Sequence, residues 1–172
     1  DGAAGLMIPL VNTPEDAAAL ASAVKYPPVG QRGLDGASLD NDFYLHGTAT
    51  YTAEANKETF LIVQIETPES LSNIEAIAAT PGVDGLFIGP GDLSLRLECA
   101  LDWTHPKMAA AQDVVAAAAA KNNIAWGHPA GTPEQIAAMA KKGARLIACG
   151  SDFSAIYSAL PNFAKTLDEG LK

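Results

Sequence analysis

The tripeptide Thr-Pro-Glu occurs three times in this chain, at Thr13–Glu15, Thr67–Glu69 and Thr132–Glu134. Each copy follows an apolar stretch and precedes an alanine-rich segment. Threonine can accept an orphan backbone amide at a helix N-cap, proline suits the first helical position, and glutamate is favoured at the positive end of the helix dipole. The repeat therefore predicts three helix starts, each following an apolar stretch. In the third copy, Gln135 at the N3 position is expected to complete a capping box.

The other segments extend this alternation. Strands are expected at Gly5–Val11, Phe60–Glu66, Gly85–Ile88, Ile124–Gly127 and Arg145–Cys149. Helices are expected at Pro14–Lys25, Pro68–Ala79, His105–Lys121 and Pro133–Lys142, and from Phe153 onward, with Pro161 breaking or restarting the last one. We expect irregular structure at 26–51, and a turn and loop at 89–104. Strands that alternate with helices predict parallel βα units, and continuously apolar strands predict burial on both faces.

The chain length narrows the choice of architecture. The 172 residues suffice for one well-buried domain and hardly for two. A complete (β/α)₈ barrel has eight strands and typically about 250 residues. The five expected strands therefore leave two possibilities open, an open five-stranded sheet or a barrel-type chain without its first three βα units. The absence of an initial methionine agrees with a missing amino-terminal part.

Composition excludes some classes of function. The formal net charge of −9 argues against nucleic-acid binding, which requires clustered Lys and Arg. Apolar runs stay short of the roughly 20 residues needed to span a bilayer. Two cysteines without metal-type spacing favour free thiols in a reducing, cytoplasmic compartment.

Two acidic residues come directly after neighbouring strand patterns, and they are the main candidates for chemistry. Glu66 ends the apolar run Phe60-Leu-Ile-Val-Gln-Ile, and Asp92 ends the turn Gly89-Pro-Gly-Asp. Because the carboxyl ends of parallel strands form one rim, two carboxylates there are suited to a hard cation such as Mg²⁺. Gln64 points to the same side as Glu66, since strand side chains alternate. Each residue taken alone also fits an ordinary local role beside a helix cap or in a turn.

These stretches, taken jointly, resemble the HpcH/HpaI aldolase family. The match includes Val63-Gln-Ile-Glu-Thr67 and Gly82-Val-Asp-Gly-Leu-Phe-Ile-Gly-Pro-Gly-Asp-Leu-Ser94, with support from Ile8-Pro-Leu-Val-Asn12 and Tyr26-Pro-Pro-Val-Gly-Gln-Arg-Gly33. The resemblance covers nearly the whole chain but only the fourth to eighth strands of the family's barrel. It implies a (β/α)₈ TIM-barrel fold, with residues 1–172 forming one domain that holds the last five βα units.

The resemblance also implies the chemistry, that of a class II, pyruvate-dependent aldolase. Glu66 and Asp92 match the carboxylates that hold a divalent metal, Mg²⁺, Mn²⁺ or Co²⁺. The amides of Gly91 and Asp92 match those that receive the carboxylate of pyruvate or another 2-oxo acid, and Gln64 supports the site as a hydrogen-bond donor. The implied reaction cleaves a 4-hydroxy-2-oxo acid to pyruvate and an aldehyde through a metal-stabilised enolate. The lysines also argue against a Schiff-base mechanism, because none falls at an expected strand end.

Several points depart from the family pattern or stay open. The resemblance places an oxyanion-binding Arg and a proton-managing His–Asp pair on strands earlier than those seen here, so no general base is assigned to this chain. The segment Leu34–Thr50 differs from the usual family loop, which affects the choice of aldehyde. Oxaloacetate decarboxylase or macrophomate-synthase-like chemistry at the same site is the alternative activity, and a non-catalytic subunit or fragment is the alternative of another class. The family further suggests a homo-oligomer, often a hexamer that exchanges carboxy-terminal helices.

Overall fold

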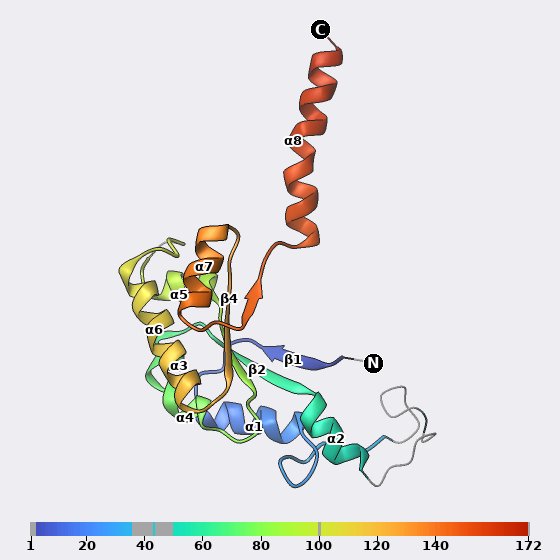
Figure 1. Cartoon of the computed structure of the whole chain (residues 1–172), viewed down its shortest axis with the longest axis vertical. Helices are drawn as coiled ribbons and strands as arrows, with labels where there is room; N and C mark the ends of the chain where they lie inside the picture. Colours follow the sequence, from blue (N-terminus) through green and yellow to red (C-terminus); the bar gives the residue numbers. More distant parts are fainter. Residues whose placement is uncertain (1–2, 36–42, 44–49, 100, 172) are drawn as a thin grey trace.

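The computed structural model describes residues 3–35, 43, 50–99 and 101–171. Within these residues five parallel strands form one sheet, in the same order as in the sequence (Figure 1). The strands are β1 (Gly5–Ile8), β2 (Phe60–Ile65), β3 (Gly85–Ile88), β4 (Ala125–Pro129) and β5 (Leu146–Ala148). Each connection therefore moves one strand further in the same direction, as in successive βα units of a barrel. The predicted parallel α/β architecture with five strands, a part of a barrel-type sheet, is confirmed.

Most of the helices that connect the strands gather on one side of the sheet (Figure 1). The connecting helices are α1 (Pro14–Val24), α2 (Tyr51–Glu58), α3 (Pro68–Ser72), α4 (Ile74–Ala78), α5 (Pro90–Arg96), α6 (Pro106–Lys121) and α7 (Pro133–Lys141). Of these, α2 lies beyond the amino end of β2 (Figure 1). The last helix, α8 (Asp152–Gly170), projects away from this body. None of the described helices is both long and apolar enough to cross a membrane.

The three Thr-Pro-Glu copies begin helices, as predicted. The hydroxyl groups of Thr13, Thr67 and Thr132 accept hydrogen bonds from the backbone amides of the N3 residues of α1, α3 and α7. Each cap is a reciprocal capping box, and Gln135 closes the third one. Such caps stabilise a helix by about 1 kcal/mol each, so the repeat fixes where three of the connecting helices start.

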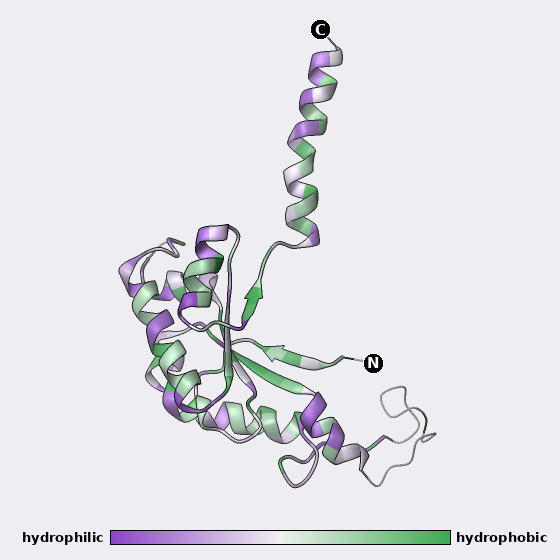
Figure 2. Ribbon diagram, viewed as in Figure 1, coloured by the Kyte–Doolittle hydropathy of each residue, from purple (hydrophilic) through white to green (hydrophobic). Residues whose placement is uncertain are grey.

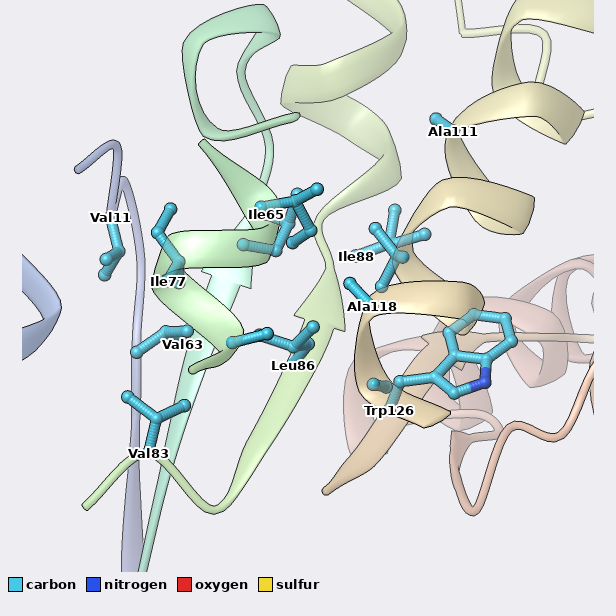
Figure 3. Packing of buried hydrophobic residues seen from close by; sticks show 14 of the residues in the cluster. Val11, Val63, Ile65, Ile77, Val83, Leu86, Ile88, Ala111, Ala118 and Trp126 are labelled. Atoms are coloured by element: carbon cyan, nitrogen blue, oxygen red, sulfur yellow. The ribbon is translucent and has the colours of Figure 1, made fainter. Parts of the chain in front are cut away.

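The core lies between the sheet and these helices. On β2, Leu61, Val63 and Ile65 are fully buried and belong to the same apolar cluster as Ile77 of α4 and Ala118 of α6 (Figure 3). Burial of each of the three strand side chains contributes roughly 1.5–3 kcal/mol. Because side chains alternate along a strand, the intervening β2 positions face the other side of the sheet, and the residue that follows β2 on that side is Glu66.

Some element predictions were wrong. Residue 51 does not end an irregular segment but begins the helix α2. The expected helix Pro68–Ala79 is divided at Asn73, whose backbone lies outside the helical region with φ of −98° and ψ of 5°. The side-chain amide of Asn73 donates to the carbonyl of Asn12. Pro161 lies inside α8 without ending it. Only the carbonyl one turn earlier loses its helical donor there, and on an exposed helix water can hydrate that group.

Strand and helix ends otherwise agree with the predictions to within a few residues. β1 ends at Ile8, three residues early, because Leu10 adopts a left-handed backbone conformation with φ of 57°. β4 extends to Pro129 and therefore includes His128, which was expected just beyond the strand. Most of the segment Leu34–Thr50 lies outside the described residues.

Candidate functional site

Glu66 and the start of α5 lie side by side at the carboxyl ends of two neighbouring strands. In the register of β2 and β3, Ile65 pairs with Ile88, so the next residues along each strand are Glu66 and Gly89. The amide of Gly89 donates to the carbonyl of Ile65 at 3.3 Å, which extends the pairing to this point. The predicted common rim is therefore present.

The Glu66 carboxylate is buried and held in place. Glu66 is only 5% exposed. Oε1 accepts a 2.7 Å hydrogen bond from the backbone amide of Leu10. Oε2 lies over Gly89, at a position that the Cβ of any larger residue would occupy. A glycine at 89 is thus what admits the carboxylate between the segment after β1 and the first turn of α5.

Asp92 belongs to the first turn of α5, not to the turn and loop predicted for 89–104. The helix begins because Pro90 fits its first position and the carbonyl of Gly89 accepts from the amide of Leu93. The Asp92 side chain is 56% exposed, which leaves it accessible to a ligand. Its negative charge is favourable at this end of the helix.

Arg96 connects the two acidic positions and is not among the predicted site residues. One guanidinium nitrogen lies 3.6 Å from the carboxylate of Asp92, and another donates to the backbone carbonyl of Glu66 at 3.4 Å. Asp92 and the end of β2 are therefore both within reach of one side chain. The signal was the spacing of four between Asp92 and Arg96, which becomes informative once the segment is known to be helical.

The remaining predicted residues lie around this position. Gly91 is in the first turn of α5, and a Cβ added there would have open space around it. The amides of Gly91 and Asp92 have no acceptor one turn earlier in their own helix, as for every helix start. Gln64 is half-buried on the same side of β2 as Glu66, and its amide lies 3.5 Å from the sulfur of Met7.

The carboxylates of Glu66 and Asp92 are oxygen donors of the kind that a hard divalent cation prefers. Glu66 and Asp92 offer two carboxylates, and in the described part of the chain no group of three or more His, Cys, Asp or Glu side chains could hold a metal ion. A cation at this rim would therefore need further oxygen ligands from water and a bound substrate. Mg²⁺ has this preference, since it commonly binds through one or two carboxylates and keeps several waters.

His128 does not belong to this site. Trp126, two residues earlier on β4, is part of the core beneath the helices (Figure 3). By strand alternation His128 faces the same helical layer, whereas Glu66 faces the opposite side of the sheet. Burial lowers the pKa of His128 below its usual value of 6.5, and the positive charge of Lys142 lowers it further. His128 is accordingly a buried neutral residue between helices and not a group at the rim.

Comparisons with known proteins show the family of the chain. The profile of the HpcH/HpaI aldolase/citrate lyase family matches residues 1–159. The chain is 41% identical over 156 residues to hydroxypyruvate/pyruvate aldolase of Chromohalobacter salexigens, covering 90% of this chain and 58% of that protein. It is 37% identical over 163 residues to 5-keto-4-deoxy-D-glucarate aldolase of Klebsiella pneumoniae, covering 92% and 61%.

The fold agrees as well. The crystal structure of an HpcH/HpaI aldolase from Desulfitobacterium hafniense superimposes with a TM-score of 0.90 at 31% identity, over 98% of this chain and 65% of that one. The chain spans about three fifths of the length of the curated relatives that it matches. On the profile, the relatives and the fold together, the chain belongs to the HpcH/HpaI aldolase/citrate lyase family.

Proposed function

We propose that this chain carries the metal and 2-oxo acid site of a carbon–carbon lyase that cleaves 4-hydroxy-2-oxo acids to pyruvate and an aldehyde. The observation that carries the proposal is the buried carboxylate of Glu66, fixed by Leu10 and Gly89 beside the first turn of α5. The family, and the aldolase names of two relatives, support the reaction class.

In this proposal each residue has a distinct role. Glu66 and Asp92 hold a divalent cation, Mg²⁺, Mn²⁺ or Co²⁺, which when bound supplies Lewis-acid stabilisation of the negative charge that develops as the carbon–carbon bond breaks. The amides of Gly91 and Asp92 receive the carboxylate of the 2-oxo acid, because they point out of the first turn of α5. Gln64 donates a hydrogen bond from the same side of β2. The group that removes the proton from the 4-hydroxyl is not assigned to any residue of this chain.

Arg96 has a supporting role at the same site. Its contacts to Asp92 and to the carbonyl of Glu66 orient the acidic side chain before a cation binds. A cation that enters must compete with the guanidinium for the Asp92 carboxylate. Since this ion pair is long and exposed, it is worth less than about 1 kcal/mol and does not prevent binding.

The proposal is tested by binding and by product analysis. The full chain is freed of metal with a chelator and titrated with Mn²⁺, alone and with pyruvate, by isothermal titration calorimetry. If pyruvate binds only in the presence of Mn²⁺, the result supports the proposed site. If neither Mn²⁺ nor pyruvate binds, the result contradicts it. The chain with metal is then given oxaloacetate, or pyruvate plus small aldehydes, and the products are identified.

The product pattern separates the alternatives. Reversible formation of 4-hydroxy-2-oxo acids supports the aldolase. Decarboxylation of oxaloacetate without aldol products favours the oxaloacetate decarboxylase or macrophomate-synthase-like reaction. Binding of metal and pyruvate without turnover of any substrate favours a non-catalytic part of a larger protein. The three outcomes are distinct, because binding and turnover are measured separately.

We also propose that the chain acts in a homo-oligomer, with a hexamer as the family expectation. The support comes from α8, in which none of the described side chains is buried. The large apolar residues of α8, and Leu171 directly after it, follow helical spacing and are 55–78% exposed. They are Phe153, Ile156, Tyr157, Leu160, Phe163, Leu167 and Leu171. Figure 2 shows this helix carrying apolar residues away from the body of the molecule. Such a stripe is typical of a helix that packs against another chain.

A cytoplasmic location is part of the proposal. Cys99 is buried, Cys149 is exposed, and both are free thiols. An exposed free thiol is more typical of a reducing compartment than of an oxidising one, where it would tend to form disulfides.

A further inference from the structure

A cavity of about 250 Å³ lies between α6 and α7, over the carboxyl end of β4. Its lining comes from four parts of the chain: the loop before α6, one face of α6, the end of β4 and one face of α7. The residues that matter for its chemistry are Trp103, Gln112, His128, Ala138, Met139 and Lys142. An apolar cavity of about 150 Å³ is known to hold benzene, so this space can take one substituted aromatic ring.

The cavity is separate from the candidate metal site. A Cβ added at Gly127 would meet the side chain of Phe87 and the backbone of Leu146. The side-chain direction at position 127 is therefore away from the helices. His128 therefore points toward the helical layer, on the opposite side of the sheet from Glu66. A ligand in the cavity would not touch the carboxylates at the rim.

The inner wall of the cavity presents a hydrogen-bond acceptor. His128 is 3% exposed, and its Nδ1 lies 2.6 Å from the carbonyl oxygen of Pro129. A carbonyl can only accept, so Nδ1 carries the proton and Nε2 carries a lone pair. The Nε2 atom has the side-chain amide of Gln112 at 3.5 Å, which is too long for a strong hydrogen bond. A buried acceptor with so weak a partner can gain from a better donor.

The walls of the cavity are mainly apolar. The Trp103 ring lies nearly perpendicular to the His128 ring, with centroids 6.2 Å apart, and Met139 of α7 is 7% exposed. The ammonium group of Lys142 already has partners. It lies 2.7 Å from the carboxylate of Asp113 and donates to the carbonyl of Ala109 at 3.2 Å. The site therefore favours a neutral molecule with an aromatic body and one hydrogen-bond donor.

We propose that this cavity binds a small neutral aromatic alcohol, whose ring packs against Trp103 and Met139 and whose hydroxyl donates to Nε2 of His128. Edge-to-face contact with Trp103 suits an aromatic ring better than an aliphatic chain. The hydroxyl would replace the weak Gln112 contact with an O–H to nitrogen hydrogen bond. The proposal concerns a second site and does not depend on the aldolase reaction.

The test compares two probes of nearly the same shape. The full chain is titrated with phenol, which has the donor, and with anisole, in which a methyl group replaces the hydroxyl proton. Binding is followed through backbone and indole amide signals in ¹H–¹⁵N spectra. We expect phenol to bind with Kd on the order of 1 mM or below, and anisole about tenfold more weakly. Equal affinity for the two probes, or binding of neither, would overturn the proposal.

Two substitutions of α7 locate the binding. Ala138→Phe places a ring in the cavity from an exposed helical position, so the chain should fold and lose phenol binding at least tenfold. Ala137→Phe, one residue earlier and outside the cavity lining, is the matched control and should bind phenol as the original chain does. In His128→Leu, the preference for phenol over anisole should disappear. Unchanged phenol binding in Ala138→Phe would show that phenol binds elsewhere, which also overturns the proposal.

Discussion

The backbone amide of Leu10 donates a 2.7 Å hydrogen bond to the Oε1 atom of Glu66, 56 residues away in the sequence. This bond ties the segment after β1 to the end of β2. It also supports the left-handed conformation of Leu10, which is uncommon for a residue with a branched side chain. The same carboxylate that is proposed to bind metal therefore has a structural role.

The first prediction separates these two roles of Glu66. Glu66→Gln keeps a carbonyl oxygen that can accept from Leu10, but it removes the negative charge. We expect the affinity for Mn²⁺ to fall at least tenfold and metal-dependent turnover to be lost, while the free energy of unfolding changes by less than about 1 kcal/mol. Asp92→Asn should behave in the same way. Calorimetry and urea unfolding measure the two effects, and retained metal affinity and activity in both variants would contradict the assignment.

The second prediction uses the two glycines of the Gly89-Pro-Gly-Asp92 segment as a matched pair. In Gly89→Ala the new Cβ would collide with Oε2 of Glu66 and push the carboxylate from its position. We expect a loss of stability of about 1–3 kcal/mol and weaker Mn²⁺ binding. In Gly91→Ala the Cβ meets open space, so stability should stay the same or rise by up to about 1 kcal/mol. Equal effects of the two substitutions on urea unfolding would argue against this packing.

Much of this geometry could be predicted from the sequence, because it depends on local patterns. The Thr-Pro-Glu caps and the apolar strand runs act within a few residues, so helix starts and strand positions agreed to within a few residues. The placement of Glu66 and Gly89 on neighbouring strands then follows from the parallel order of successive βα units. Family resemblance supplied the roles of these residues, which spacing alone left undecided.

The rest depends on contacts between distant segments. Asn73, which lies between α3 and α4, bonds to Asn12, and Leu10, just after β1, bonds to Glu66. Neither contact has a sequence signature. The helix α5 was missed because a Gly-Pro-Gly segment usually indicates a turn, although Pro90 also suits a first helical position. The role of Arg96 was hidden by the same error.

The third prediction concerns Lys25, which is 1% exposed at the amino ends of the strands. Its ammonium group lies 2.7 Å from the carboxylate of Asp84 and donates to the carbonyl of Thr59 at 2.6 Å. Lys25→Met removes this buried charge and its hydrogen bonds, and we expect the free energy of unfolding to fall by about 2–3 kcal/mol. Lys121→Met is the control, because the exposed pair of Lys121 with Glu75 should contribute less than about 1 kcal/mol. Similar losses in both variants, measured by urea unfolding, would refute a special role for Lys25.

The fourth prediction concerns pH and His128. Burial lowers the pKa of this residue below 6.5, so the folded chain binds fewer protons than the unfolded chain as the pH falls through that value. The contribution of His128 to stability is therefore present above pH 6.5 and is lost as the pH falls toward the lower pKa of the folded state. We expect the free energy of unfolding of His128→Gln to fall less than that of the original protein as the pH is lowered from about 7.5 to about 5.5. If the original protein and His128→Gln differ in free energy of unfolding by the same amount at both pH values, this prediction is wrong.

The fifth prediction tests the exposed stripe of α8. Tyr157 and Phe163 are 67% and 69% exposed, on a helix that has no buried residue among those described. If another copy of the chain covers this stripe, replacing both residues with serine should remove apolar contact area and lower the oligomeric mass. Thr166→Ser with Lys165→Gln, on the same helix, is the control and should leave the mass unchanged. Sedimentation velocity over a hundredfold range of concentration measures the masses. A chain that is monomeric at every concentration, with or without the substitutions, would show that copies of this chain do not associate through α8.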